Sequence, residues 1–241
     1  MKKFSGYAET EVHDFIQYDK LNLGPHYCKI TDVKEITMQG QSGPYSYLQV
    51  NIDTTDKDTQ PQFYLKRYKQ DVDQDAQTAK WRGVYRVFIP DDDGSEKDNK
   101  KKEMFKSFIT TIEKSNPGYD WEKTNWDEKT LIGKQFIGVF ALKEFQNDMG
   151  KVITFTECRF VRSLENDIEK IPIPKVRLLD GTLMEYEDYL EREENQKEQE
   201  GKFQENVIDD DQSDDLPFWL KHNTKINLLK SNLRGFYSIL I

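Results

Sequence analysis

The sequence predicts a mainly β domain of five strands and one helix, followed by a disordered acidic tail. Three observations predict this class. Segments in which apolar and polar residues alternate recur between residues 27 and 161, as in half-buried strands. Residues 103–115 instead have the spacing of an amphipathic helix. Residues 181–217 hold 14 Asp and Glu against 3 Lys and Arg, a composition that cannot supply a core.

The first two strands are expected to form a hairpin. Residues 27–36 mix β-branched and charged residues, as a half-buried strand does, and residues 39–44 have the composition of a turn. Residues 45–53 then alternate cleanly, because side chains on a strand point to opposite faces in turn. The residues predicted to share the apolar face are Leu48, Val50 and Ile52.

Residues 62–68 are predicted to form the third strand. Phe63 and Leu65 would share its apolar face, and the opposite face would carry Tyr64, Lys66 and Tyr68. Residues 81–88 again interleave aromatic residues with arginine. A helix is predicted over Glu103–Ser115, where an apolar stripe runs up to the stop signal at residues 116–118.

The most apolar strand, residues 136–142, is expected to be central, and a tight turn at 147–150 leads into another alternating strand over 151–161. Three strands, a helix and two strands form the order of an OB fold, a partly open five-stranded barrel that binds single-stranded nucleic acid. Another small barrel or sheet with one helix would show the same periodicity.

The chain is expected to divide into an arm (1–26), an OB-like domain (27–175), an acidic flexible tail (176–218) and a basic, apolar extension (219–241). No run approaches the roughly 18 apolar residues of a membrane span, and the N-terminus lacks the apolar core of a signal peptide. The two cysteines form no Cys-x-x-Cys pair, which fits a reduced compartment. We therefore expect a cytoplasmic protein without membrane contact.

The sequence carries no motif of a known enzyme class. It lacks a phosphate-binding loop, a His-Glu-x-x-His pair and a nucleophile elbow, and its three histidines are scattered. Aspartates at 71, 73 and 75 and at 91–93 lie in polar stretches, where solvated turns are the usual interpretation. We expect a binding protein without cofactor or metal, and the alternative is a metal-dependent nuclease.

Binding of single strands without sequence preference requires cations along the phosphates and aromatic faces on which bases stack. The residues predicted to supply them are Tyr45, Tyr47, Tyr64, Lys66, Arg67, Tyr68, Lys80, Trp81, Arg82, Tyr85 and Arg86. The competing interpretation is that aromatic residues of a β domain form its core. We expect that role for Phe63, Phe136, Phe140 and Phe160, and we expect Trp121 and Trp126 to pack under a loop.

Two sets of segments resemble a known family. Residues Asp214, Asp215, Leu216, Pro217 and Phe218 resemble the acidic tip with which bacterial single-stranded DNA-binding proteins recruit replication and repair partners. Within residues 1–175, the segments that resemble single-stranded DNA-binding proteins of phages of Gram-positive bacteria are 24–30, 80–86, 105–109, 116–119 and 126–134. The resemblance implies an OB-type fold, sequence-tolerant binding to single-stranded DNA, and roles in phage replication and recombination in the host cytoplasm.

The sequence departs from this family after the tip, which in the family ends the chain. Here residues 219–241 follow, and the 24 residues from Phe218 onward hold 4 Lys and Arg and no carboxylate. They are either an added element that folds against the acidic segment or a partner, or translated sequence beyond a lost stop codon. The alternative to DNA binding is a protein-interaction or DNA-mimic module acting through the acidic segment. The oligomeric state stays open, a homo-oligomer included.

Overall fold

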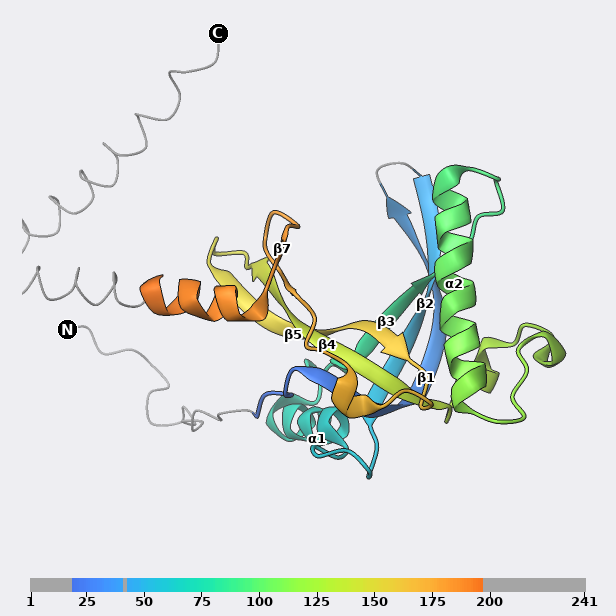
Figure 1. The fold of residues 1–241 in the computed structure, drawn as a ribbon, viewed down its shortest axis with the longest axis horizontal. Coiled ribbons are helices and arrows are strands. Elements are labelled where there is room, and N and C mark those ends of the chain that lie inside the picture. Colours follow the sequence, from blue (N-terminus) through green and yellow to red (C-terminus); the bar gives the residue numbers. More distant parts are fainter. Residues whose placement is uncertain (1–18, 41–42, 197–241) are drawn as a thin grey trace, which may run out of the picture. The chain divides into compact units, whose positions relative to one another are not determined.

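The computed structural model describes residues 19–40 and 43–196, and a seven-stranded mixed sheet runs through them (Figure 1). Its order is β3-β2-β1-β4-β6-β7, with β5 paired to β4. The prediction of a mainly β domain is confirmed at this coarser level. The sheet has seven strands rather than the predicted five, and within the described residues it does not close into a barrel. The strands are β1 (Gly24–Gly40), β2 (Gly43–Thr54), β3 (Val84–Phe88), β4 (Gln135–Gln146), β5 (Val152–Arg162), β6 (Val176–Arg177) and β7 (Leu183–Met184).

Both predicted hairpins are confirmed. β1 and β2 pair antiparallel from Cys28–Thr54 to Gly40–Gly43, with an irregularity between Ile30 and Asp32. β4 and β5 pair antiparallel across the turn at 147–150, where Asn147 Oδ1 accepts hydrogen bonds from two backbone N–H groups. β4 is also central as predicted, because β1, β5 and β6 all pair with it.

The prediction of a strand over residues 62–68 is wrong. These residues begin α1 (Phe63–Asp75), and the third strand of the chain is β3. Two side chains at the end of β2 start the helix: Asp53 Oδ1 accepts from Tyr64 N at 2.8 Å, and Thr54 Oγ1 accepts from Phe63 N at 2.9 Å. They satisfy backbone donors that every helix leaves unpaired in its first turn.

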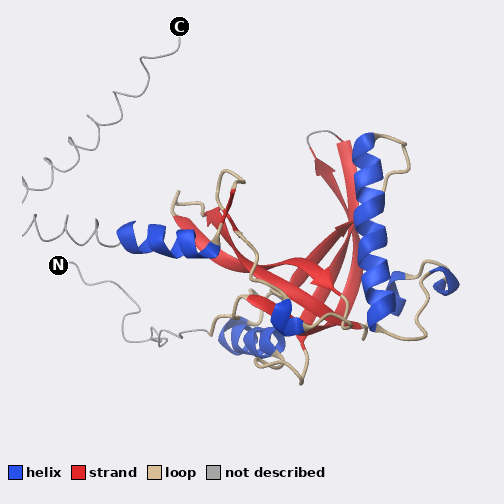
Figure 2. Ribbon diagram, viewed as in Figure 1, coloured by secondary structure: helices blue, strands red, loops and turns tan. Residues whose placement is uncertain are grey.

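The second helix, α2 (Glu96–Ser115), confirms the predicted amphipathic helix but starts seven residues earlier. Ser95 caps it by accepting from Asp98 N at 3.0 Å. Phe108, Ile109 and Ile112 of its apolar stripe are buried, whereas Met104 is 57% exposed. Asn116 ends the helix by donating to Ile112 O and Gln135 O. Figure 2 shows the two helices at separate places beside the sheet.

One apolar cluster spans the sheet and both helices. Phe136 and Phe140 are fully buried in it as predicted, whereas Phe63 and Phe160 are only partly buried. Trp121 is 4% exposed, as expected for packing, but Trp126 is 63% exposed. Tyr64 joins the cluster against Phe140, with ring centroids 6.3 Å apart.

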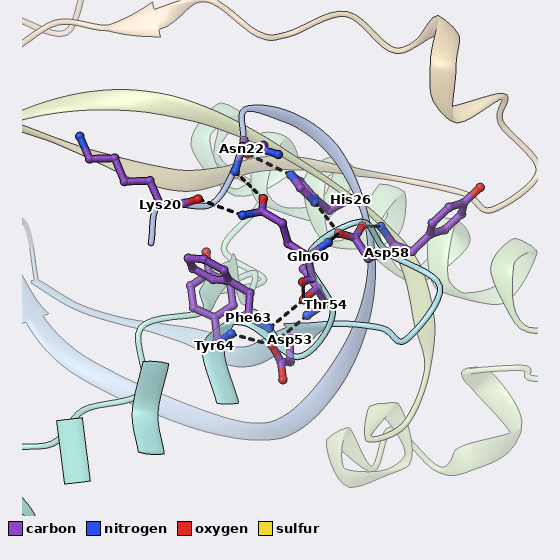
Figure 3. A network of polar contacts seen from close by, with 10 residues as sticks. Lys20, Asn22, His26, Asp53, Thr54, Asp58, Gln60, Phe63 and Tyr64 are labelled. Carbon is purple, nitrogen blue, oxygen red and sulfur yellow. Dashed lines mark hydrogen bonds and ion pairs between the residues drawn. The ribbon is translucent and has the colours of Figure 1, made fainter. Parts of the chain in front are cut away.

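The chain is ordered on both sides of the predicted domain limits at 27 and 175. Before residue 27, a buried polar network fixes His26: its Nδ1 lies 2.9 Å from Asp58 Oδ1 and its Nε2 lies 2.9 Å from Asn22 O (Figure 3). Gln60 extends this network by accepting from Asn22 N and donating to Lys20 O. After residue 175, β6 and β7 join the sheet, and residues 186–196 are helical.

No helix in the part of the chain that the structure describes is long and apolar enough to cross a membrane.

Candidate nucleic-acid interface

β1, β2 and β3 share a face that points away from the apolar cluster, here named the outer face. Leu48, Val50 and Ile52 point to the core, so the alternate residues of β2 point to the outer face. The register places Tyr47 opposite Phe88 and Gln49 opposite Arg86. The outer face of β2 and β3 is therefore formed by Tyr45, Tyr47, Gln49, Asn51, Arg86 and Phe88.

Three rings pack together at one end of the outer face. Tyr45, Tyr47 and Phe88 form this aromatic cluster, with centroids 6.0–6.3 Å apart. The Arg86 guanidinium lies 5.4 Å from the Tyr47 centroid, a cation–π contact. Tyr47 is only 4% exposed, whereas Phe88 is 37% exposed. Tyr47 thus supports the cluster from below, and Phe88 and the partly exposed Tyr45 present ring surface to solvent.

The other end of the outer face is hollowed into a groove of about 520 Å³. The residues that line it include Lys29, Asp32, Asn51, Asp53, Tyr68 of α1 and Trp81. The ring centroids of Tyr68 and Trp81 lie 5.8 Å apart. Trp81 Nε1 donates to Gly83 O at 3.0 Å and Ile52 O at 3.2 Å, which fixes the indole against β2. Asn51 lies four residues from Tyr47 on the same strand, about 13 Å at 3.3 Å per residue. Groove and aromatic cluster therefore lie on one continuous face.

The cations near this face differ in what they already bind. Arg82 Nη2 lies 2.9 Å from Asp71 Oδ2, and Arg67 Nε lies 3.4 Å from Asp71 Oδ1. Asp71 is buried, so these two arginines compensate its charge, and Arg82 also ties α1 to the segment before β3. Arg86 contacts a ring rather than a carboxylate, and Lys66 and Lys80 are exposed.

Two predicted DNA contacts lie in the core instead. Tyr64 is buried, and Tyr85 packs against Phe108 with centroids 6.0 Å apart. Burial raises the pKa of both phenols above the usual range, as expected for rings removed from water. Tyr64 belongs to α1 and not to the predicted strand, and Tyr85 lies on the core side of β3.

The structure also adds residues that the sequence-based prediction missed. Phe88 completes the aromatic cluster, and its signal was available: it stands two residues after Arg86 on a strand and so shares its face. Alternation along β2 also places Asn51 on the outer face, whereas Lys29 carries no such local signal, because the groove that it lines also needs α1 and Trp81.

Three of the aspartates considered as nuclease ligands form ion pairs with basic side chains. Asp71 pairs with the two arginines, Asp91 lies 2.5 Å from Lys101 Nζ, and Asp92 lies 2.6 Å from Lys102 Nζ. Within residues 19–40 and 43–196, no three His, Cys, Asp or Glu residues gather in a way that could hold a metal ion.

The predicted partner-binding residues 214–218 and the extension 219–241 lie outside the described residues, so their roles stay predictions. No protein-family model matches the sequence, and the comparison with curated proteins gives no match.

Proposed function

We propose that the protein binds single-stranded DNA, without strong sequence preference, on the outer face of β1–β3. The observation that carries the proposal is the joining of partly exposed rings, Arg86 and a lysine-containing groove on one strand face. Stacking on such rings is sequence-tolerant because every base has a π-face, and it contributes about 1–3 kcal/mol per base.

The connectivity supports the same proposal. Three antiparallel strands, α2 and a β4–β5 hairpin, with β1 paired to β4, follow the order of an OB fold opened between β3 and β5. In OB folds the face of strands 2 and 3 binds oligonucleotides. The resemblance to phage single-stranded DNA-binding proteins extends the proposal to protection of single strands during phage replication and recombination, with residues 214–218 recruiting partners.

Titration of a labelled poly-dT strand by fluorescence anisotropy, at low and moderate salt and with a duplex control, tests the proposal. We expect saturable, salt-sensitive binding to the single strand and much weaker binding to the duplex. Phe88→Ala should weaken binding by about 5- to 100-fold, since one stacking surface is lost. Phe155→Ala is the matched control, because Phe155 is similarly exposed, at 41%, but lies on β5. Absence of binding by the folded protein, or equal effects of the two variants, would contradict the proposal.

A further inference from the structure

A second hollow, of about 720 Å³, lies beside α2 and is here named the α2 groove. Leu48 lines it together with Phe105 and Ile109 of α2 and with Trp121 and Trp126 from the loop that follows α2. Because Leu48 and Tyr47 are neighbours on β2 and point to opposite faces, the α2 groove and the aromatic cluster lie on different sides of the sheet.

Trp126 is held in this groove as an exposed aromatic surface. It stacks on Phe105 with centroids 6.4 Å apart and an interplanar angle of 12°, and it meets Trp121 edge-on at 5.9 Å. Its φ is 61°, and that of Asn125 is 55°, so two successive non-glycine residues adopt the left-handed conformation. The loop thus keeps a 63% exposed indole in a conformation that is unfavourable for its backbone.

Trp121 adds a buried hydrogen-bond donor that is not used. Its ring is 4% exposed, and its Nε1 has no acceptor among the residues that the structure describes. Trp81 Nε1, by contrast, has two carbonyl acceptors. Leaving a buried N–H unpaired costs free energy, and an acceptor from a bound ligand would recover it.

The charges around the α2 groove specify the ligand. Five carboxylates and two lysines line it, and Lys102 is held by Asp92 at 2.6 Å and Asp98 at 3.0 Å. Of the other four carboxylates, Glu113 accepts a hydrogen bond from Trp121 N at 2.9 Å. No ion pair engages Glu35, Glu122 or Glu128 within the described part of the chain. Such a rim repels phosphates and attracts cations.

We propose that the α2 groove binds a segment of a partner protein in which Lys or Arg stands next to an aromatic or aliphatic residue. The apolar side chain packs on Phe105 and Trp121, and a backbone carbonyl of the segment accepts from Trp121 Nε1. The cation lies between the glutamates of the rim and the face of Trp126. This inference does not rest on DNA binding by the outer face.

The indole N–H signals of the full-length protein, labelled with ¹⁵N-tryptophan, provide the test. The chain has four tryptophans, whose signals are assigned with single Trp→Phe variants. The probes are short synthetic peptides that combine Lys or Arg with Trp, Phe or Leu, and matched peptides carry Glu in place of each basic residue. We expect basic peptides to move the Trp121 and Trp126 signals saturably, to move Trp121 downfield as its N–H gains an acceptor, and to leave Trp81 in place.

Charge reversal at the rim is the second readout. Glu122→Lys combined with Glu128→Lys should weaken the best peptide at least fivefold, whereas Glu165→Lys, an exposed carboxylate elsewhere, should not. The proposal is overturned if no basic peptide moves the Trp121 signal, or if rim reversal leaves peptide binding unchanged. It is also overturned if poly-dT moves Trp121, because the groove would then be a nucleic-acid site. Under the DNA proposal poly-dT moves Trp81 and leaves Trp121 and Trp126 in place, so the two proposals fail separately.

Discussion

Gly138 of β4 lies at a tightly packed point of the core. A Cβ built there would lie 3.0 Å from both Cys28 Sγ and Phe140 Cε2, and 3.4 Å from Cys158 Sγ. Both cysteines are buried and free. Burial raises the pKa of Cys28 well above its ordinary value and raises that of Cys158 to about 12. Neither thiol is therefore a ready nucleophile or metal ligand in the folded protein.

This burial predicts slow thiol chemistry and a loss of stability in alkali. At pH 8 we expect a thiol reagent to react with both cysteines within minutes in denaturant but over hours in the native protein. Because the folded pKa values are raised, their contribution to stability is intact below pH 9, the ordinary thiol value, and is lost as pH rises toward the folded values. Absorbance of the released chromophore measures the rates. Immediate native reaction of both thiols would contradict the buried arrangement.

Arg82 distinguishes a structural cation from a DNA-binding one. Its side chain pairs with buried Asp71, so Arg82→Ala should lower the free energy of unfolding by about 1–3 kcal/mol in a urea titration. Lys80→Ala, two residues away and exposed, should leave unfolding unchanged. If Arg82→Ala weakens poly-dT binding without altering the unfolding midpoint, the sequence-based assignment of Arg82 to DNA is the better one.

Among the elements, α1 shows most clearly what local pattern leaves undecided. Phe63 to Tyr68 alternates like a strand, yet Tyr64 and Asp71 are also one helical face and are the buried residues of α1. The helix is selected by Asp53 and Thr54, which lie about ten residues earlier and become caps only once β2 is in place. The hairpins were predictable because their turns and partners are neighbours in sequence.

The candidate interface was predictable only where it depends on neighbours in the sequence. Alternation along β2 places Tyr45 and Tyr47 on one face, and the register between β2 and β3, which the sequence does not give, brings Arg86 to that face. Alternation does not show which aromatic residues remain accessible to solvent, because accessibility depends on the side chains packed around each ring. Tyr47 is covered by the other residues of its cluster. The groove at Trp81 depends on α1, and the local pattern of residues 62–68 predicts a strand there, so the sequence does not predict the groove.

The capping of α1 gives a prediction at the scale of this element. Asp53→Ala removes the acceptor for Tyr64 N and should destabilise the protein by about 1–2 kcal/mol. Asp53→Asn keeps an oxygen at the same place and should lose much less. Thermal unfolding followed by circular dichroism compares the two variants. Equal losses would mean that the carboxylate acts through its charge and not as a cap.

At the scale of the whole molecule, the negative charge is unevenly distributed. Residues 1–180 hold 28 Lys and Arg against 30 Asp and Glu, so the region that contains the outer face is nearly neutral. Under the proposed function, few cations would contact phosphates, and binding would rely on stacking more than it does in a strongly basic protein. We predict that the acidic residues 209–215 compete with DNA under these conditions, most strongly at low salt, where screening is weak.

This competition can be measured without shortening the chain. Replacing Asp209, Asp210, Asp211, Asp214 and Asp215 by Asn removes five charges at constant length. We expect this variant to bind poly-dT about 3- to 30-fold more tightly at 50 mM salt, and the gain to vanish near 300 mM as the Debye length shortens. A variant with the same ten residues, 209–218, in shuffled order keeps the charge and should keep the original DNA affinity while losing any partner that reads Leu-Pro-Phe. Equal DNA affinity of all three proteins at low salt would show that the acidic segment does not compete for the outer face, and would leave partner recruitment as its remaining proposed role.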